Sequence, residues 1–239
     1  MSNEHTLKFF GEELQQLKAA VAQLGGLVES QVADSIRAVA TRDVGLAQAV
    51  VGRDQKLDQL QMEIEKKAIR MIALRQPVAQ DLRRTVSAMK MAWNLERTGD
   101  QAKNIGKRAL IIAEAEPITP LTRSVERMGK LVMERLKAAL DAYNDGELDQ
   151  ALMVWRKDQE VDEHYNSLFR ELLTYMMSDP RLIGACAQLL FVAKNLERIG
   201  DHATNVAEII HYEVTGEEIE GDRPRWMGRE ALDHGDRAC

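Results

Sequence analysis

The chain has 239 residues, and 45% of them are hydrophobic, which is enough to bury a core and excludes disorder of the whole chain. Aromatic residues make up only 5%, while residues with good helix propensity dominate, so the composition favours an all-α protein. The formal net charge is -6, with acids and bases interspersed. No Lys/Arg stripe stands out to bind phosphates, and this excludes nucleic acid as the main partner and a polybasic membrane anchor.

The sequence shows no targeting or membrane-spanning segment. The first residues lack a basic region followed by an apolar stretch, which a secretory signal peptide would need. No apolar run approaches the roughly 20 residues that span a bilayer. We therefore expect a cytoplasmic protein.

Prolines and glycines divide the chain into six helical segments. Pro77 separates the second segment from the third, Pro117 and Pro120 close the first half, Gly146 ends the fourth, and Pro180 ends the fifth. Segments of this length favour a helical bundle over a mixed fold. The predicted helices cover residues 6–40, 45–74, 78–115, 121–143, 147–177 and 181–214.

The two halves of the sequence repeat each other. Residues 94–100 read Asn-Leu-Glu-Arg-Thr-Gly-Asp, and residues 195–201 read Asn-Leu-Glu-Arg-Ile-Gly-Asp. Upstream, residues 54–58 read Asp-Gln-Lys-Leu-Asp, and residues 158–162 repeat the pattern as Asp-Gln-Glu-Val-Asp. A duplicated unit of three helices predicts an all-α fold of two tandem, pseudo-symmetric three-helix bundles. We place the first unit at 1–116, the second at 117–216 and a flexible tail at 217–239, where the helical periodicity is lost.

Each repeat carries two pairs of carboxylates spaced four residues apart. Positions i and i+4 share one face of a helix, so the members of a pair lie side by side. Two carboxylates about 5 Å apart repel by roughly 3 kcal/mol at an effective dielectric near 20, so converging pairs need water or a cation. Carboxylate oxygens suit Mg, Ca, Mn and bridged iron. The predicted metal ligands are Asp54, Asp58, Glu96 and Asp100 in the first half, and Asp158, Asp162, Glu197 and Asp201 in the second.

The same spacing has a simpler explanation, since carboxylates on a helix surface are usually solvated or paired with basic residues. Arg97 and Arg198 are candidate partners. Gly99 and Gly200 add weight to a built site, because a glycine inside a helix costs about 1 kcal/mol relative to alanine. Its presence in both copies predicts close approach of a neighbouring helix.

Two copies of Asn-Leu-Glu-Arg-x-Gly-Asp, each preceded by Asp-x-x-x-Asp on the helix before, resemble the PhoU family over residues 6–216. The resemblance implies a cytoplasmic, often dimeric, negative regulator of the phosphate regulon. It would connect the ATPase subunit of the high-affinity phosphate ABC transporter with a sensor histidine kinase, and would meet the membrane only through these partners. Some members bind multinuclear metal clusters at these motifs, which implies Fe, Mn, Zn or Mg at the eight carboxylates named above.

Two other functions remain open from the sequence. A carboxylate-bridged di-iron oxidase would need two Glu-x-x-His pairs, and the chain has one, Glu208 and His211, with Lys107 at the position equivalent to Glu208 in the first copy. No nucleophile and base constellation and no phosphate-cradling glycine loop are visible, so we expect no enzyme activity. A metal-independent adaptor would instead use the acidic stripes to dock basic protein surfaces.

Overall fold

The computed structural model describes residues 2–115, 119–221 and 223, and this part of the chain consists of helices joined by short turns, without a β-strand. The all-α prediction is confirmed. Of the predicted break at 116–120, residues 116–118 lie outside the described residues, as do 222 and 224–239 of the predicted tail. Pro120 does not stand between helices as predicted but lies in the first turn of α4, where a missing N–H is tolerated. The elements are α1 (Ser2–Thr41), α2 (Val44–Arg75), α3 (Ala79–Glu114), α4 (Thr119–Asp145), α5 (Leu148–Arg156), α6 (Asp158–Ser178), the short 3-10 helix η1 (Pro180–Leu182) and α7 (Ile183–Thr215).

Local chemistry explains where these helices begin and end. The Asp43 side chain caps α2 by accepting the Leu46 N–H at 2.9 Å. At the other end of α2, Gln76 adopts the left-handed conformation directly before Pro77. Gly216 ends α7 with a φ of 82°, a conformation that glycine adopts without strain.

The predicted fifth helix is divided in two, which corrects its extent. The chain turns at Lys157, whose N–H bonds to Val154 O at 3.2 Å, and a new helix begins at Asp158. The turn places Asp158 at the N-terminus of α6, where the helix dipole favours a negative charge. A buried hydrogen bond from Thr204 Oγ1 to Asp158 Oδ1 at 2.6 Å holds that end of α6 against α7.

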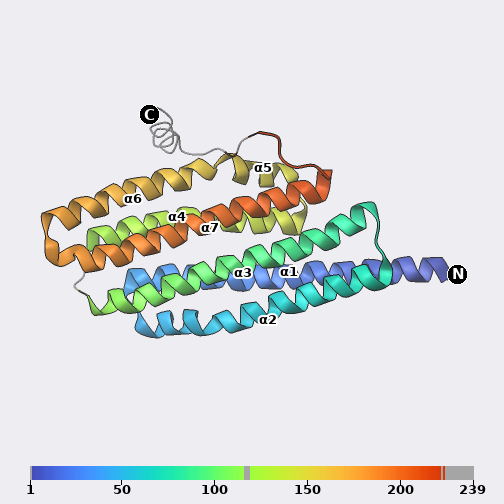
Figure 1. The fold of residues 1–239 in the computed structure, drawn as a ribbon, viewed down its shortest axis with the longest axis horizontal. Helices are drawn as coiled ribbons and strands as arrows, with labels where there is room; N and C mark the ends of the chain where they lie inside the picture. The colour runs from blue at the N-terminus through green and yellow to red at the C-terminus, as the bar shows by residue number, and fades with distance from the viewer. Residues whose placement is uncertain (1, 116–118, 222, 224–239) are drawn as a thin grey trace, which may run out of the picture.

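The helices form two groups that pack side by side (Figure 1). In the first group α1, α2 and α3 contact one another, and in the second α7 contacts α4, α5 and α6. The groups meet where α3 packs against α7 and α1 packs against α4. The two helices that carry the repeated motif are therefore neighbours.

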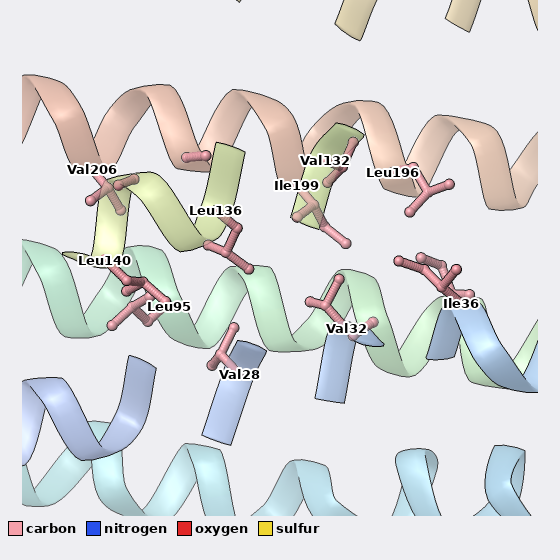
Figure 2. Packing of buried hydrophobic residues seen from close by; sticks show 14 of the residues in the cluster. Val28, Val32, Ile36, Leu95, Val132, Leu136, Leu140, Leu196, Ile199 and Val206 are labelled. Carbon is pink, nitrogen blue, oxygen red and sulfur yellow. The ribbon is translucent and has the colours of Figure 1, made fainter. Parts of the chain in front are cut away.

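A single hydrophobic cluster runs through both groups. Between them, Val28 and Val32 of α1 and Leu95 of α3 face Leu136 of α4 and Ile199 of α7 (Figure 2). All five side chains are fully buried. This shared core fixes α3 relative to α7, and it therefore fixes the frame in which the acidic motifs lie.

In the described part of the chain, none of the helices combines the length and the apolarity that crossing a membrane requires.

Candidate functional site

The motif glycines are points of close helix contact. A Cβ added at Gly99 would lie 2.4 Å from Leu57 Cδ1 of α2, and one added at Gly200 would lie 2.9 Å from Val161 Cγ1 of α6. Without a side chain at these positions α3 lies directly against Leu57 of α2, and α7 against Val161 of α6. The sequence-based expectation of close approach is confirmed in both copies. Each glycine precedes a motif aspartate, so the contact draws the acidic pairs of adjacent helices together.

The first carboxylate cluster lies between α2 and α3 and consists of Asp54, Asp58, Glu96 and Asp100. Burial raises the pKa of the Asp58 carboxyl, and the charge of Asp54 raises it further. The pKa of Glu96 is also raised, first by burial and then by the three other carboxylates of the cluster. The four acids therefore lie close enough to repel one another.

Lys103 supplies a cation to the first cluster. Its ammonium group donates a hydrogen bond to Asp54 Oδ2 and lies 3.5 Å from Asp100 Oδ1. The hydrogen bond to Asp54 raises the pKa of Lys103, so the ammonium form is favoured. Lys103 thus bridges α2 and α3 at the place where their carboxylates meet.

The second cluster lies between α6 and α7 and consists of Asp158, Asp162, Glu197 and Asp201. Asp158 and Glu197 are buried, each with 8% of its surface exposed. Burial raises the pKa of Asp201 to about 6, and the charges of the other three carboxylates raise it too, against the opposing effect of Arg223. The structure therefore brings the four predicted residues of this half together as well.

Two basic side chains contact the second cluster. Lys194 Nζ lies 2.7 Å from Glu197 Oε1, one turn earlier on α7. Arg223 reaches in from the segment that follows α7, with Nη1 4.0 Å from Asp201 Oδ1 and Nε 3.9 Å from Asp158 Oδ2. The guanidinium is closer to Glu208, with Nη2 3.2 Å from Oε1.

The first asparagine of the repeated motif joins the two halves. Asn94 Nδ2 donates to the backbone oxygen of His202 at 2.7 Å, and its Oδ1 lies 2.9 Å from His202 Nδ1. Burial, followed by the charges of nearby arginines, lowers the pKa of His202 to about 4, so the ring is neutral at pH 7. In the second copy, Asn195 donates instead to Phe191 O of its own helix at 2.6 Å. His202 therefore has a structural role at the α3–α7 contact.

The donor set of each cluster fits a hard or borderline cation, because it offers several carboxylate oxygens in a partly buried place. Among the described residues, however, no three His, Cys, Asp or Glu side chains are arranged as a ready ligand group. Lys103 and Arg223 lie among the carboxylates instead. A metal ion would therefore bind with rotation of the acid side chains and displacement of a protein cation.

The Glu-x-x-His pair of the oxidase alternative does not form a joint ligand set. Glu208 Oε1 accepts hydrogen bonds from Trp155 Nε1 and Arg223 Nε, each at 3.2 Å. His211 Nδ1 lies 2.9 Å from the backbone oxygen of Glu217. The two side chains have separate partners at the end of α7.

Four residues of the site were missed from the sequence: Lys103, Lys194, Thr204 and Arg223. Lys103 and Lys194 stand three positions from an acidic motif residue, and this spacing could have indicated an ion pair on one helix face. Nothing in the local sequence indicates the contacts of Arg223. Its segment was expected to be flexible, and its described part instead reaches the second cluster.

Comparisons with known proteins agree on one family. The model of the PhoU domain matches residues 21–109 and again residues 125–210, once in each half. The chain is 66% identical to a phosphate-specific transport system accessory protein PhoU homolog of Caulobacter vibrioides, over 93% of this chain and 96% of that protein. The corresponding homolog of Rhizobium meliloti is 46% identical over 94% of this chain and 95% of its own length.

Solved structures give the same result for the fold. The crystal structure of PhoU from Pseudomonas aeruginosa superposes with a TM-score of 0.82 at 38% identity, covering 87% of this chain and 100% of that one. The phosphate transport system regulatory protein PhoU from Streptococcus pneumoniae also superposes with a TM-score of 0.82, at 30% identity and over 89% of this chain and 100% of that one. Both halves of the sequence, the helical fold and the two acidic motifs thus lead to one conclusion, which is that the chain belongs to the PhoU family.

Proposed function

We propose that this protein is an accessory regulator of a phosphate-specific transport system and keeps the phosphate regulon repressed when phosphate is plentiful. The observation that carries the proposal is the similarity to proteins named for that role over nearly the whole length of both chains. The regulator acts by protein–protein contacts between the ATPase subunit of the phosphate ABC transporter and a sensor histidine kinase. It works in the cytoplasm as a homodimer and meets the membrane through these partners.

The helical architecture supports a role in contacts rather than catalysis. Long helices joined through one core present rigid faces, which suit docking to two partners. The polar groups gathered at the site are carboxylates in contact with lysine and arginine, a set suited to cation binding. We therefore propose that the protein is not an enzyme.

The carboxylate clusters are proposed as metal sites that hold neighbouring helices together. In the first, Asp54 and Asp58 of α2 and Glu96 and Asp100 of α3 would hold the ion. In the second, Asp158 and Asp162 of α6 and Glu197 and Asp201 of α7 would do so. A bound Fe, Mn, Zn or Mg ion would neutralise the repelling carboxylates and link α2 to α3 and α6 to α7.

A gene deletion tests the regulatory proposal. Loss of the protein should derepress phosphate-starvation genes in phosphate-rich medium, and the wild-type gene supplied in trans should restore repression. A reporter driven by a phosphate-starvation promoter gives the readout. Normal repression in the deletion strain would count decisively against this function.

Elemental analysis separates metal binding from the metal-independent adaptor. Protein purified without chelator should carry a transition or alkaline-earth metal, and the Asp100→Ala, Asp201→Ala double variant should carry less. Equal and negligible metal in both proteins would favour the adaptor. Oxygen consumption after iron loading would instead support the oxidase.

A further inference from the structure

The helices α3 and α7 run antiparallel and side by side along the molecule (Figure 1). Contacts between them locate their shared outer edge at three levels: Lys90 with Tyr212, Asn94 with His202, and Arg108 with Phe191. The residues spaced three or four apart that line this edge, from Lys90 to Arg108 on α3 and from Phe191 to Tyr212 on α7, are here called the seam. At 1.5 Å per residue, the seam is about 27 Å long.

The seam carries positive charge and no carboxylate. Lys90 and Arg97 of α3 and Arg198 of α7 are exposed, and Arg108 is half-buried. The seam positions between them hold neutral polar residues, namely Gln101, Asn104, His202 and Asn205. In a chain of net charge -6, a strip of this length without an acid is a distinct surface. It is not visible in the sequence because two helices far apart in the chain supply its cations.

The two motif arginines, candidate partners of the acids by sequence, contribute their charge to the seam. In the part of the chain that the structure describes, the ion pairs of the acidic clusters are formed by Lys103, Lys194 and Arg223. Arg97 and Arg198 lie near His202, and their charges, after burial, lower the pKa of that ring. The positive charge of both arginines is therefore available at the surface.

Two aromatic side chains stand exposed along the same strip. Trp93 is 51% exposed and Phe191 is 50% exposed. Phe191 lies beside Arg108, with the guanidinium 4.5 Å from the ring centroid, so the two aromatic residues are about 22 Å apart along the seam. Exposed aromatic residues beside arginines are typical of surfaces that bind another protein.

The margins of the seam are acidic, which limits what can lie on it. Asp100 borders it on α3 and Asp201 on α7, with side chains 45% and 47% exposed. A nucleic acid duplex or an anionic membrane would set phosphates against these carboxylates as well as against the arginines. A single helix, about 10 Å across, can follow the basic strip and keep its own acids off the margins.

Two occupants from this chain itself do not fit the charge. A second copy would bring an equally basic seam, and like charges facing each other oppose association. Residues 224–239 contain as many arginines as acids, so they offer no acidic excess to a basic strip. An acidic segment of another protein complements the seam.

Resting on the proposed role as a regulator that acts by protein contacts, we propose that the α3–α7 seam is the docking surface for one acidic amphipathic helix of a partner protein. Acids along one stripe of that helix pair with Arg97, Arg198 and the lysine and arginine at the two ends. Apolar residues in the same stripe cover Trp93 and Phe191. Basic residues on either side of the stripe face the acidic margins.

A designed peptide tests the seam directly. The probe is a fluorescein-labelled helical peptide of about 20 residues, with glutamates in one stripe, two leucines about 22 Å apart in that stripe, and lysines on both sides. Fluorescence anisotropy at about 0.15 M salt, where charges farther apart than about 8 Å are screened, should show binding to the wild type. A peptide of the same composition in permuted order should bind about tenfold more weakly, because it forms no acidic stripe.

Matched variants separate the seam from general charge. Arg97→Gln with Arg198→Gln should weaken peptide binding about tenfold, and Trp93→Ala with Phe191→Ala should do the same. Arg70→Gln with Lys130→Gln removes as much charge from exposed positions of α2 and α4 and should change the affinity less than about twofold. Circular dichroism should show wild-type helix content in all three proteins.

Three results would overturn the docking surface. The first is equal binding of the striped and permuted peptides. The second is an unchanged affinity after Arg97→Gln with Arg198→Gln. The third is binding of a labelled DNA duplex as tight as that of the striped peptide and lost in the same variant, which would make the seam a nucleic acid surface.

Complementation of the deletion strain separates this inference from the proposed function. The Arg97→Gln, Arg198→Gln protein should accumulate to the wild-type level and fail to repress the phosphate-starvation reporter, while the Arg70→Gln, Lys130→Gln protein restores repression. Full repression by the seam variant would refute a regulatory role of the seam and leave the proposed function standing. If the deletion strain itself represses normally, the proposed function falls, and the peptide titrations still decide whether the seam binds an acidic helix.

Discussion

Replacing Gly200 by alanine is expected to destabilise the protein, because α6 leaves no room for a methyl group there. The new Cβ would lie 2.9 Å from Val161 Cγ1, 3.3 Å from Cγ2 and 3.4 Å from Cβ. Rotation of a β-branched side chain replaces one methyl by the other, so Val161 cannot turn away. The two helices must therefore move apart at the point that draws the second carboxylate cluster together.

The magnitude follows from two opposing effects. Overfilling a packed core costs about 1–3 kcal/mol, and alanine returns about 1 kcal/mol of helix propensity relative to glycine. The expected net loss is about 1 kcal/mol, and roughly 2 kcal/mol if α6 cannot shift. With a urea dependence of about 3 kcal/mol per molar, the unfolding midpoint should fall by about 0.3–0.7 M.

Gly26 provides a matched control within α1. It is exposed, and a Cβ added there meets nothing within 4 Å. Gly26→Ala should therefore stabilise the protein by about 0.5–1 kcal/mol. Both variants can be compared with the wild type by urea unfolding followed by circular dichroism. If Gly200→Ala unfolds at the wild-type midpoint or above while Gly26→Ala behaves as expected, the close contact of α6 and α7 is wrong.

Three further outcomes can be measured by urea unfolding of chelator-treated protein. Asp201→Asn should raise the free energy of unfolding at pH 7 by about 1 kcal/mol, a value reduced for partial exposure, and the gain should fade as the pH falls from about 6, where the native carboxyl of the wild type takes up a proton, to about 4, where the unfolded carboxyl does. Asn94→Ala should cost about 1–3 kcal/mol, because the partly buried His202 Nδ1 and Asn205 Nδ2 lose their shared partner, Asn94 Oδ1. Asn195→Ala should cost less, because its bond lies within one helix. Lys103→Met should cost about 2 kcal/mol at pH 7, since Asp54 is buried and loses its cation, and added Mg²⁺ should recover part of that loss. An unchanged midpoint in any of these variants would contradict the contact on which it rests.

Much of the fold and the acidic residues of the site could be predicted because the relevant signals are local. Helix periodicity and proline positions predicted the segments, and the break at Lys157 was missed because no proline or glycine marks it. Spacing of four residues placed Asp54 beside Asp58, and Glu197 beside Asp201, on single helix faces. The glycine in each motif predicted close packing that the structure confirms. Whether these carboxylates bind metal stays a prediction.

The sequence by itself determined the helical class, the duplication and the acidic pairs, since propensity, periodicity and i to i+4 spacing depend only on neighbours along the chain. The tertiary structure alone decided which groups face those acids. Asn94 bonds to α7 and Arg223 bonds back to the second cluster because the shared core sets α3 beside α7 and the chain turns at Gly216. Such contacts join residues far apart in sequence, and the free energy that selects them comes from burying the whole core rather than from the residues that touch.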